Sequence, residues 1–381
     1  MKLPALLAVI LALAACLPAQ TTRYRDMIFP RAAVQTDLIF GSALNSYTQK
    51  TEILKLDLYL PQGDTATSRP AMVIVHGGGF KNGDKATGQF RKLAQDFARR
   101  GFIAISINYR LRKSGSLVYQ NVVDAAHDMK AAVRWLHKNK VKLKLDPDRI
   151  GCIGGSAGAI TCCEAAYVPG EGKSGNPGHP SRLHAVVDLW GFLWDPSEME
   201  IGEAPVIIVH GTKDPAVPYQ RSIILKQRAD LVGVPAELHP IQDGGHGPWG
   251  DYFSKYHAQH TIAFLWESLK LAQISGLGAR SGYQSPGRLT IDSYGIAKDS
   301  VVLIASAGQS KLSLPPWGIL YLDMQSSVPL PTLQFAASPR LPAATNQLTI
   351  PGGLKGSIHW QAVQFKGTAP RILTNAVTTN F

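Results

Sequence analysis

Runs of apolar residues alternate with segments of helical periodicity over residues 71–272. Ala71–Val75 and Phe102–Ile107 are continuous apolar runs, which are typical of strands buried on both faces of a parallel sheet. Between Val118 and Lys138 apolar residues recur every three or four positions, as they do along one face of a helix. Buried strands that alternate with helices predict an α/β fold with a doubly wound, mostly parallel sheet.

The beginning of this domain has a different pattern. Thr36–Ser42 and Lys50–Leu60 have strand character, and apolar residues nearly alternate with polar ones between Glu52 and Leu60. Such alternation is typical of a half-exposed antiparallel strand. We therefore expect the sheet to begin with antiparallel strands, after a surface lead-in at residues 21–32.

The same patterns place the remaining elements of the domain, which we assign to residues 21–275. The other predicted strands are Arg149–Ile153, His184–Leu189, Pro205–Val209 and Ala236–Ile241. The other predicted helices are Ala86–Arg100, Gln220–Leu231 and Tyr252–Ala272.

The character of the chain changes near Ile274–Pro286, where Gly, Ser and Gln cluster. We assign residues 276–285 to a linker. Beyond it, short apolar runs separated by Pro and Gly turns predict a small all-β, sandwich-like domain at residues 286–381. This accessory domain is expected either to bind a polysaccharide or polyester, or only to pack on the larger domain.

Residues 1–20 have the pattern of a secretory signal peptide. Lys2 supplies the positive start, and Leu6–Leu13 is an apolar stretch too short for a membrane span. Two endings compete. Cleavage near Ala19-Gln20 releases the protein outside the cell or into the periplasm, and we favour this ending. The alternative is a bacterial lipobox that leaves Cys16 as a lipid anchor. We expect no transmembrane span elsewhere.

The composition argues against several classes of protein. The 381 residues carry a formal net charge of +12, but Lys and Arg are scattered and no basic block with interleaved aromatic residues appears. We therefore expect no nucleic-acid partner. Besides Cys16, the cysteines are Cys152, Cys162 and Cys163, whose spacing suits neither a disulfide framework nor a zinc site. We expect no metal and no organic cofactor.

The segment Gly154-Gly155-Ser156-Ala157-Gly158 lies between a predicted strand and a run of small residues typical of a helix. A serine at such a turn is lifted above the end of the sheet, and the glycines leave room for a crowded backbone. Ser156 is therefore a candidate nucleophile. The motif alone is a weak signal, and the alternative is an ordinary Gly-rich loop.

A serine nucleophile needs a base, and an acid that orients the base. Asp214 follows one predicted strand and His246 follows the next. Three loops in the order Ser156, Asp214, His246 predict a catalytic triad on an α/β sheet. Asp243 is the alternative acid, ranked lower because it shares the loop of the histidine.

Three further histidines lie at the ends of strands. We expect His76 to brace its own loop by hydrogen bonding, and we interpret His210 and His239 as structural.

Attack on an ester carbonyl places negative charge on its oxygen, which needs donors already in position. The loop His76–Gly79 follows a buried strand and can aim backbone N–H groups at that oxygen. The N–H of Ala157, at the positive end of the following helix, is the other expected donor. The loop lacks the Gly-Lys-Ser/Thr end of a phosphate-binding loop, which argues against that alternative.

Taken together, these motifs resemble the α/β-hydrolase esterases that carry an HGGG loop. The motifs are His76-Gly77-Gly78-Gly79-Phe80, Gly83-Asp84-Lys85, Asn108-Tyr109-Arg110, Gly154–Gly158, His210-Gly211-Thr212 with Asp214 and Val217-Pro218, and Gly245-His246-Gly247. The resemblance is to secreted carboxylesterases related to bacterial feruloyl and acetylxylan esterases, and to the hormone-sensitive-lipase-like branch. It implies Ser156 as nucleophile, His246 as base, Asp214 as acid, and an oxyanion hole formed by Gly78, Gly79 and Ala157.

Two features depart from the lipase-like branch. Gly155 stands where that branch usually has Asp, and no long helical cap precedes the HGGG loop. Both favour the feruloyl-esterase-like branch, and neither affects the triad.

Several aromatic residues fall on or near the loops at the active edge of the sheet: Phe80, Trp190, Phe192, Trp194 and Trp249. They are candidates for the substrate pocket, with core packing as the alternative. If they line the site, aromatic or bulky acyl esters, including polyester fragments, become plausible substrates.

The sequence thus predicts a secreted serine carboxylesterase that works through an acyl-enzyme. A serine peptidase of the prolyl-oligopeptidase type ranks second, because no propeller and no amine-anchoring segment are visible. A non-catalytic surface-binding protein ranks third, because the triad and the oxyanion loop are intact.

Overall fold

The computed structural model describes residues 23–112, 114–254 and 257–271, together with strand segments between residues 287 and 380. The chain divides into two compact units, of which the larger spans Thr22–Ala272. The predicted signal peptide, the lipobox residue Cys16 and the linker at 276–285 lie outside the described residues. Within the described residues, no helix has both the length and the apolar character needed to span a membrane.

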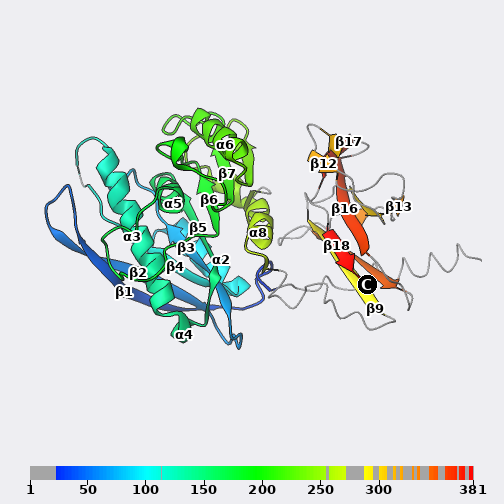
Figure 1. The fold of residues 1–381 in the computed structure, drawn as a ribbon, viewed down its shortest axis with the longest axis horizontal. Helices are drawn as coiled ribbons and strands as arrows, with labels where there is room; N and C mark the ends of the chain where they lie inside the picture. The colour runs from blue at the N-terminus through cyan, green and yellow to red at the C-terminus, as the bar shows by residue number, and fades with distance from the viewer. Residues whose placement is uncertain are drawn as a thin grey trace, which may run out of the picture. The chain divides into compact units, whose positions relative to one another are not determined.

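The larger unit is built on one eight-stranded sheet (Figure 1). Its strands are β1 (Ala32–Leu44), β2 (Thr51–Pro61), β3 (Arg69–Val75), β4 (Ile103–Ile107), β5 (Leu145–Gly155), β6 (Ala185–Leu189), β7 (Val206–Gly211) and β8 (Ala236–Ile241). They are arranged in the order β1-β2-β4-β3-β5-β6-β7-β8. The pairs β1/β2 and β2/β4 are antiparallel and all the other neighbouring pairs are parallel. This confirms the predicted parallel sheet with an antiparallel start.

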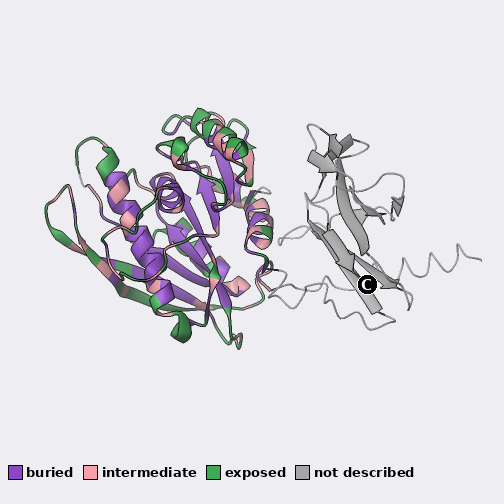
Figure 2. Cartoon of the chain, viewed as in Figure 1, coloured by how far each residue is buried: buried purple, intermediate pink, exposed green. Residues whose placement is uncertain are grey.

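Helices connect the strands and cover the sheet. They are α2 (Gly88–Arg100), α3 (Tyr119–Lys138), α4 (Lys140–Leu143), α5 (Ala157–Tyr167), α6 (Gln220–Val232), α7 (Trp249–Ser254) and α8 (His257–Ser268). Every residue of β3 and of β4 is buried, so both faces of the sheet are covered (Figure 2). Helix α3 packs against α5, whereas α2 packs against β2, β3 and β4. Gly101, with φ of 108°, ends α2 in the left-handed region, where a residue without Cβ is favoured.

Two local differences from the predicted elements have physical reasons. The helix predicted over Tyr252–Ala272 begins earlier, as α7 directly after Pro248, a residue that favours a helix start, and α8 ends at Ser268. Strand β5 begins earlier than predicted, at Leu145, which pairs with Arg69. The register then shifts so that Ala71 pairs with Ile150, and the segment around Pro147 forms an irregularity within the strand.

The second unit contains Gln273–Phe381. Its described elements are all strands: β9 (Gly287–Tyr294), β10 (Ser300–Ser306), β11 (Leu312–Leu314), β12 (Gly318–Leu320), β13 (Val328–Pro329), β14 (Leu333–Gln334), β15 (Ala343–Ile350), β16 (Ser357–Lys366), β17 (Ala369–Leu373) and β18 (Val377–Asn380). Their longest pairing joins β9 to β15. The sandwich-like domain at 286–381 stays a prediction.

The parallel strands place the predicted chemistry at one edge. Strands β3, β5, β7 and β8 run in the same direction, so the loops that follow Val75, Gly155, Gly211 and Ile241 leave the sheet on the same side. In open α/β sheets this carboxyl edge is where sites are built.

Candidate active site

Ser156 lies in a sharp turn between β5 and α5. Its backbone has φ of 55° and ψ of −122°, an uncommon conformation for a residue with a side chain. The turn is crowded: a Cβ atom on Gly154 would lie 2.3 Å from the carbonyl carbon of Gly158, and one on Gly158 would lie 2.1 Å from the Val75 oxygen. The glycines of the motif are therefore required by space, and the turn presents the Ser156 hydroxyl at the sheet edge.

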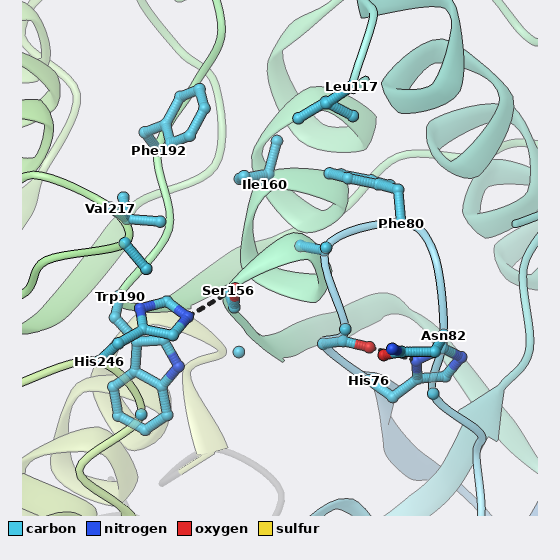
Figure 3. A pocket seen from close by; sticks show the side chains of 18 of the residues that line it. His76, Phe80, Asn82, Leu117, Ser156, Ile160, Trp190, Phe192, Val217 and His246 are labelled. Carbon is cyan, nitrogen blue, oxygen red and sulfur yellow. Dashed lines mark hydrogen bonds between the residues drawn. The ribbon is translucent and has the colours of Figure 1, made fainter. Parts of the chain in front are cut away.

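Ser156, His246 and Asp214 form a continuous hydrogen-bonded relay. The Nε2 of His246 lies 2.9 Å from the Ser156 hydroxyl (Figure 3). The Nδ1 of the same ring lies 2.7 Å from Oδ2 of Asp214. The Asp214 carboxylate is fully buried, while the His246 side chain is 29% exposed. The relay can move a proton from the serine to the imidazole while the buried carboxylate holds the ring in position.

Asp214 is held as an anion by four donors. Its Oδ1 accepts from the amides of Ala216 and Val217 at 2.8 and 2.9 Å, and its Oδ2 accepts from His246 and His210. Burial alone would raise the pKa of Asp214, but hydrogen bonds from Val217, His246 and Ala216 outweigh it and lower the pKa below its ordinary value. Asp243 instead forms an ion pair with Lys213 at 3.0 Å.

His210 extends this relay by one further residue. Its Nε2 lies 3.2 Å from Asp214 Oδ2 and 2.9 Å from the Val217 carbonyl, both acceptors, so Nε2 carries the proton. Its Nδ1 lies 2.6 Å from the hydroxyl of Ser222, which donates to it. Burial lowers the pKa of His210, which keeps it neutral. The sequence interpretation of His210 as structural did not anticipate this contact with the acid; the only signal was its position four residues before Asp214.

The loops that carry Asp214 and His246 are in close backbone contact. A Cβ atom on Gly211 would lie 2.3 Å from the carbonyl oxygen of Gly244 and 2.5 Å from that of Gly245. The amide of Lys213 donates to the same Gly244 oxygen at 2.9 Å. The distance between acid and histidine is therefore set by a glycine-lined contact between neighbouring loops.

The HGGG loop lies opposite the histidine. Gly78 and Gly79 have φ of 115° and 60°, and a Cβ on Gly78 would lie 2.0 Å from the Asn82 oxygen. His76 braces the loop as predicted: its Nδ1 donates to the Gly77 carbonyl at 2.7 Å, and its ring stacks on Tyr109 at 4.4 Å. Figure 3 shows His76 and Asn82 on the side of the cavity away from His246.

The backbone near Ser156 suits the predicted oxyanion hole. Gly78, Gly79 and Ala157 all line the cavity around the serine. Ala157 is the first residue of α5, where amides have no partner within the helix and the helix dipole is positive.

A cavity of about 830 Å³ opens above the serine, and its walls are largely apolar. All five aromatic residues proposed from the sequence line it: Phe80, Trp190, Phe192, Trp194 and Trp249. Trp190 and Trp249 meet edge to face at 4.8 Å, and a Cβ on Gly155 would lie 3.3 Å from each of them. The sequence did not point to several further lining residues, among them Phe90, Leu117, Ile160 and Arg221.

Glu164 positions the part of the cavity wall that contains Trp194. Its carboxylate accepts the amide of Trp194 at 2.7 Å and the hydroxyl of Tyr119 at 3.1 Å. The rings of Tyr119 and Trp194 lie 5.3 Å apart. Burial raises the pKa of Glu164 despite these hydrogen bonds. Because Glu164 lies on α5, the helix that begins at the nucleophile also positions this wall.

Asp188 is a buried carboxyl group at the end of β6. It accepts the Gly191 amide at 2.7 Å and so fixes the turn that contains Trp190. Its Oδ2 lies 3.9 Å from the Sγ of Cys163. Burial raises the pKa of Asp188 to about 7, against the hydrogen bond from Gly191.

We expect Asp188→Asn to change how stability depends on pH. Since the folded-state pKa lies above the ordinary 3.8, the folded protein keeps a proton that the unfolded chain releases between about pH 4 and pH 7, and the free energy of unfolding falls across this window. Asn resembles the neutral acid and cannot ionise, so the variant should not show this fall in the free energy of unfolding. The fall in the wild type amounts to at most about 4 kcal/mol. Urea unfolding of both proteins at about pH 4.5 and pH 8 measures the difference.

The exposed acid Asp230 provides the control for this measurement. It pairs with Lys226 on the surface of α6, so Asp230→Asn is expected to leave the pH dependence as in the wild type. An Asp188→Asn effect of the same size at both pH values would contradict the expectation.

Within the described residues no cluster of His, Cys, Asp and Glu could hold a metal ion. Cys152, Cys162 and Cys163 are free and buried.

A serine between a strand and a helix, with a carboxylate after β7 and a histidine after β8, is the arrangement found in serine hydrolases with the α/β-hydrolase fold. The BD-FAE family matches residues 56–199, and the prolyl oligopeptidase family matches residues 194–272.

Individual relatives agree with this class. Phenmedipham hydrolase from Pseudarthrobacter oxydans is 37% identical over 121 residues, which are 31% of this chain and 24% of that protein. The match thus spans about a quarter of that relative. Among solved structures, Thermogutta terrifontis esterase 2, phosphorylated by paraoxon, is 26% identical with a TM-score of 0.50, over 68% of this chain and 97% of the esterase. A truncated carbohydrate esterase from gut microbiota shares the fold at 23% identity and a TM-score of 0.51, over 66% of this chain and 100% of its own.

Proposed function

We propose that this protein is a serine carboxylesterase. The observation that carries the proposal is the Ser156–His246–Asp214 relay, which opens into an apolar cavity lined by the HGGG loop. Esterases among the relatives support it.

In the proposed reaction, the Ser156 oxygen attacks the ester carbonyl while His246 Nε2 takes its proton. Backbone amides of Gly78, Gly79 and Ala157 stabilise the oxyanion, each by about 3 kcal/mol. His246 then returns the proton to the leaving alcohol, and water, activated by the same histidine, clears the acyl-enzyme. The aromatic cavity favours aromatic or bulky acyl groups over short alkyl groups.

A panel of substrates tests the proposal. It contains p-nitrophenyl acetate and butyrate, hydroxycinnamate and terephthalate esters, and peptide p-nitroanilides. We expect the esters to be hydrolysed. We also expect an organophosphate to label Ser156, and the labelled protein to lose its ester hydrolysis. The second candidate is a peptidase of the prolyl-oligopeptidase type, and the family match over residues 194–272 is the observation behind it. Turnover of the anilides alone would support this second candidate. Turnover of alkyl esters but not of aromatic esters would contradict the proposed preference for aromatic or bulky acyl groups.

We also propose secretion, on the pattern of Lys2 and Leu6–Leu13. The N-terminal peptide of the mature protein, read by mass spectrometry, distinguishes release near Gln20 from lipidation at Cys16. Binding of a polymer by residues 286–381 stays a prediction.

A further inference from the structure

The walls of the cavity carry one permanently charged side chain. Most lining residues are aromatic, aliphatic or glycine, and none of them is Asp or Glu. His76 and His246 are the two titratable lining groups besides Arg221, and burial lowers the pKa of His76. A substrate therefore meets an apolar cavity with a single cation, Arg221.

Arg221 is placed beside the catalytic machinery by its own segment of chain. It is the second residue of α6, seven positions after Asp214, and its amide donates to the Pro218 carbonyl at 2.9 Å. Its guanidinium carbon lies 5.0 Å from the centre of the Phe192 ring. Figure 3 shows Phe192 and Val217 on the side of the cavity where His246 lies.

The charge of Arg221 has no partner of opposite sign in the described part of the chain. No carboxylate there lies within 4.0 Å of its guanidinium. The other cations of α6 differ: Lys226 pairs with Asp230 at 2.5 Å, and Arg228 donates to the carbonyls of Met199 and Ser197. Arg221 is exposed, so its donors are available to a ligand.

We propose that Arg221 selects esters whose acyl group ends in a carboxylate, that is, half-esters of dicarboxylic acids. This inference rests on the proposed esterase function. The planar guanidinium can donate two parallel hydrogen bonds to a carboxylate, and such charge-assisted bonds are stronger than neutral ones. An aromatic or aliphatic spacer between carboxylate and ester would pack on Phe192. The scattered positive charge of the chain, +12 in total, also favours the approach of anions.

Pairs of substrates that differ only in charge test this proposal. Monomethyl terephthalate is compared with its neutral monoamide, and monomethyl glutarate with its monoamide, with kcat/KM measured at low ionic strength. For the wild type we expect each carboxylate to be preferred over its amide by about tenfold, since Arg221 is exposed and screened. We expect Arg221→Gln to bring this ratio close to one, Arg221→Lys to keep part of it, and added salt to reduce it in the wild type.

Lys226→Gln is the matched control, because it removes the same charge from the same helix at a position outside the cavity lining. It should leave the ratio at the wild-type value. A wild-type ratio near one, or a ratio that Arg221→Gln does not change, would overturn the proposal. Turnover of p-nitrophenyl acetate by the wild type separates the two hypotheses, because its absence counts against the esterase function itself.

Discussion

Ser156→Ala is expected to lower kcat for p-nitrophenyl butyrate by at least about 10⁴-fold, with little change in KM. In the proposed reaction the hydroxyl oxygen of Ser156 attacks the ester, and the Nε2 of its partner His246 lies 2.9 Å away. The remaining activity would come from the oxyanion donors and from binding alone. Alanine accepts the backbone conformation as serine does, so the fold should be kept.

Steady-state kinetics and a thermal unfolding curve measure this expectation together. Ser197→Ala is the control, because that serine is exposed and its hydroxyl bonds only to Asp195, next to the turn at Pro196–Glu198. Its kcat should stay within about twofold of the wild type. Ester turnover that survives Ser156→Ala would show that another group carries the chemistry.

Asp214→Asn is expected to lower kcat by about 10³- to 10⁴-fold. The two carboxylate oxygens have different partners: Oδ1 accepts from two backbone amides, and Oδ2 accepts from two imidazoles. An asparagine offers one acceptor and one donor group, so it can satisfy only one of these sides.

The backbone N–H groups of Ala216 and Val217 can only donate, so the atom that faces them must be an acceptor. The Asn oxygen therefore takes the place of Oδ1, and its NH₂ group points at His246 Nδ1. The histidine must then accept at Nδ1 and carry its proton on Nε2, where it faces the Ser156 hydroxyl and cannot take the serine proton. The variant keeps its shape but holds the base in the wrong tautomer.

The neighbouring acid provides the control for this prediction. Asp243 lies in the histidine's own loop, is 61% exposed and pairs with Lys213. Asp243→Asn is expected to keep kcat within about twofold, since a surface ion pair contributes little. Comparable losses in both variants would mean that the loop, rather than the Asp214 contact, is what the reaction needs.

The sheet, its antiparallel start and the order of the site loops could be predicted because their signals are local. Continuous apolar runs mark strands buried on both faces, and alternating residues mark the half-exposed start. The helix predicted from Tyr252 starts earlier, at Trp249 after Pro248, because apolar periodicity alone does not mark where a helix begins.

The contacts that shape the site were not predictable in the same way. His210 reaches Asp214, and Glu164 holds Tyr119 and Trp194, through hydrogen bonds that periodicity does not report. Gly211 is needed only because another loop passes within 2.3 Å of where its Cβ would be.

By itself, the sequence determined the class of fold and pointed to Ser156 as candidate nucleophile and to the candidates for base and acid, because each follows from neighbours along the chain. Only the tertiary structure decided that Asp214 rather than Asp243 contacts His246, that the five aromatic residues share one cavity, and that Arg221 is the cation in its wall. These outcomes depend on how segments far apart in the chain approach each other when the sheet packs, and no local pattern encodes that approach.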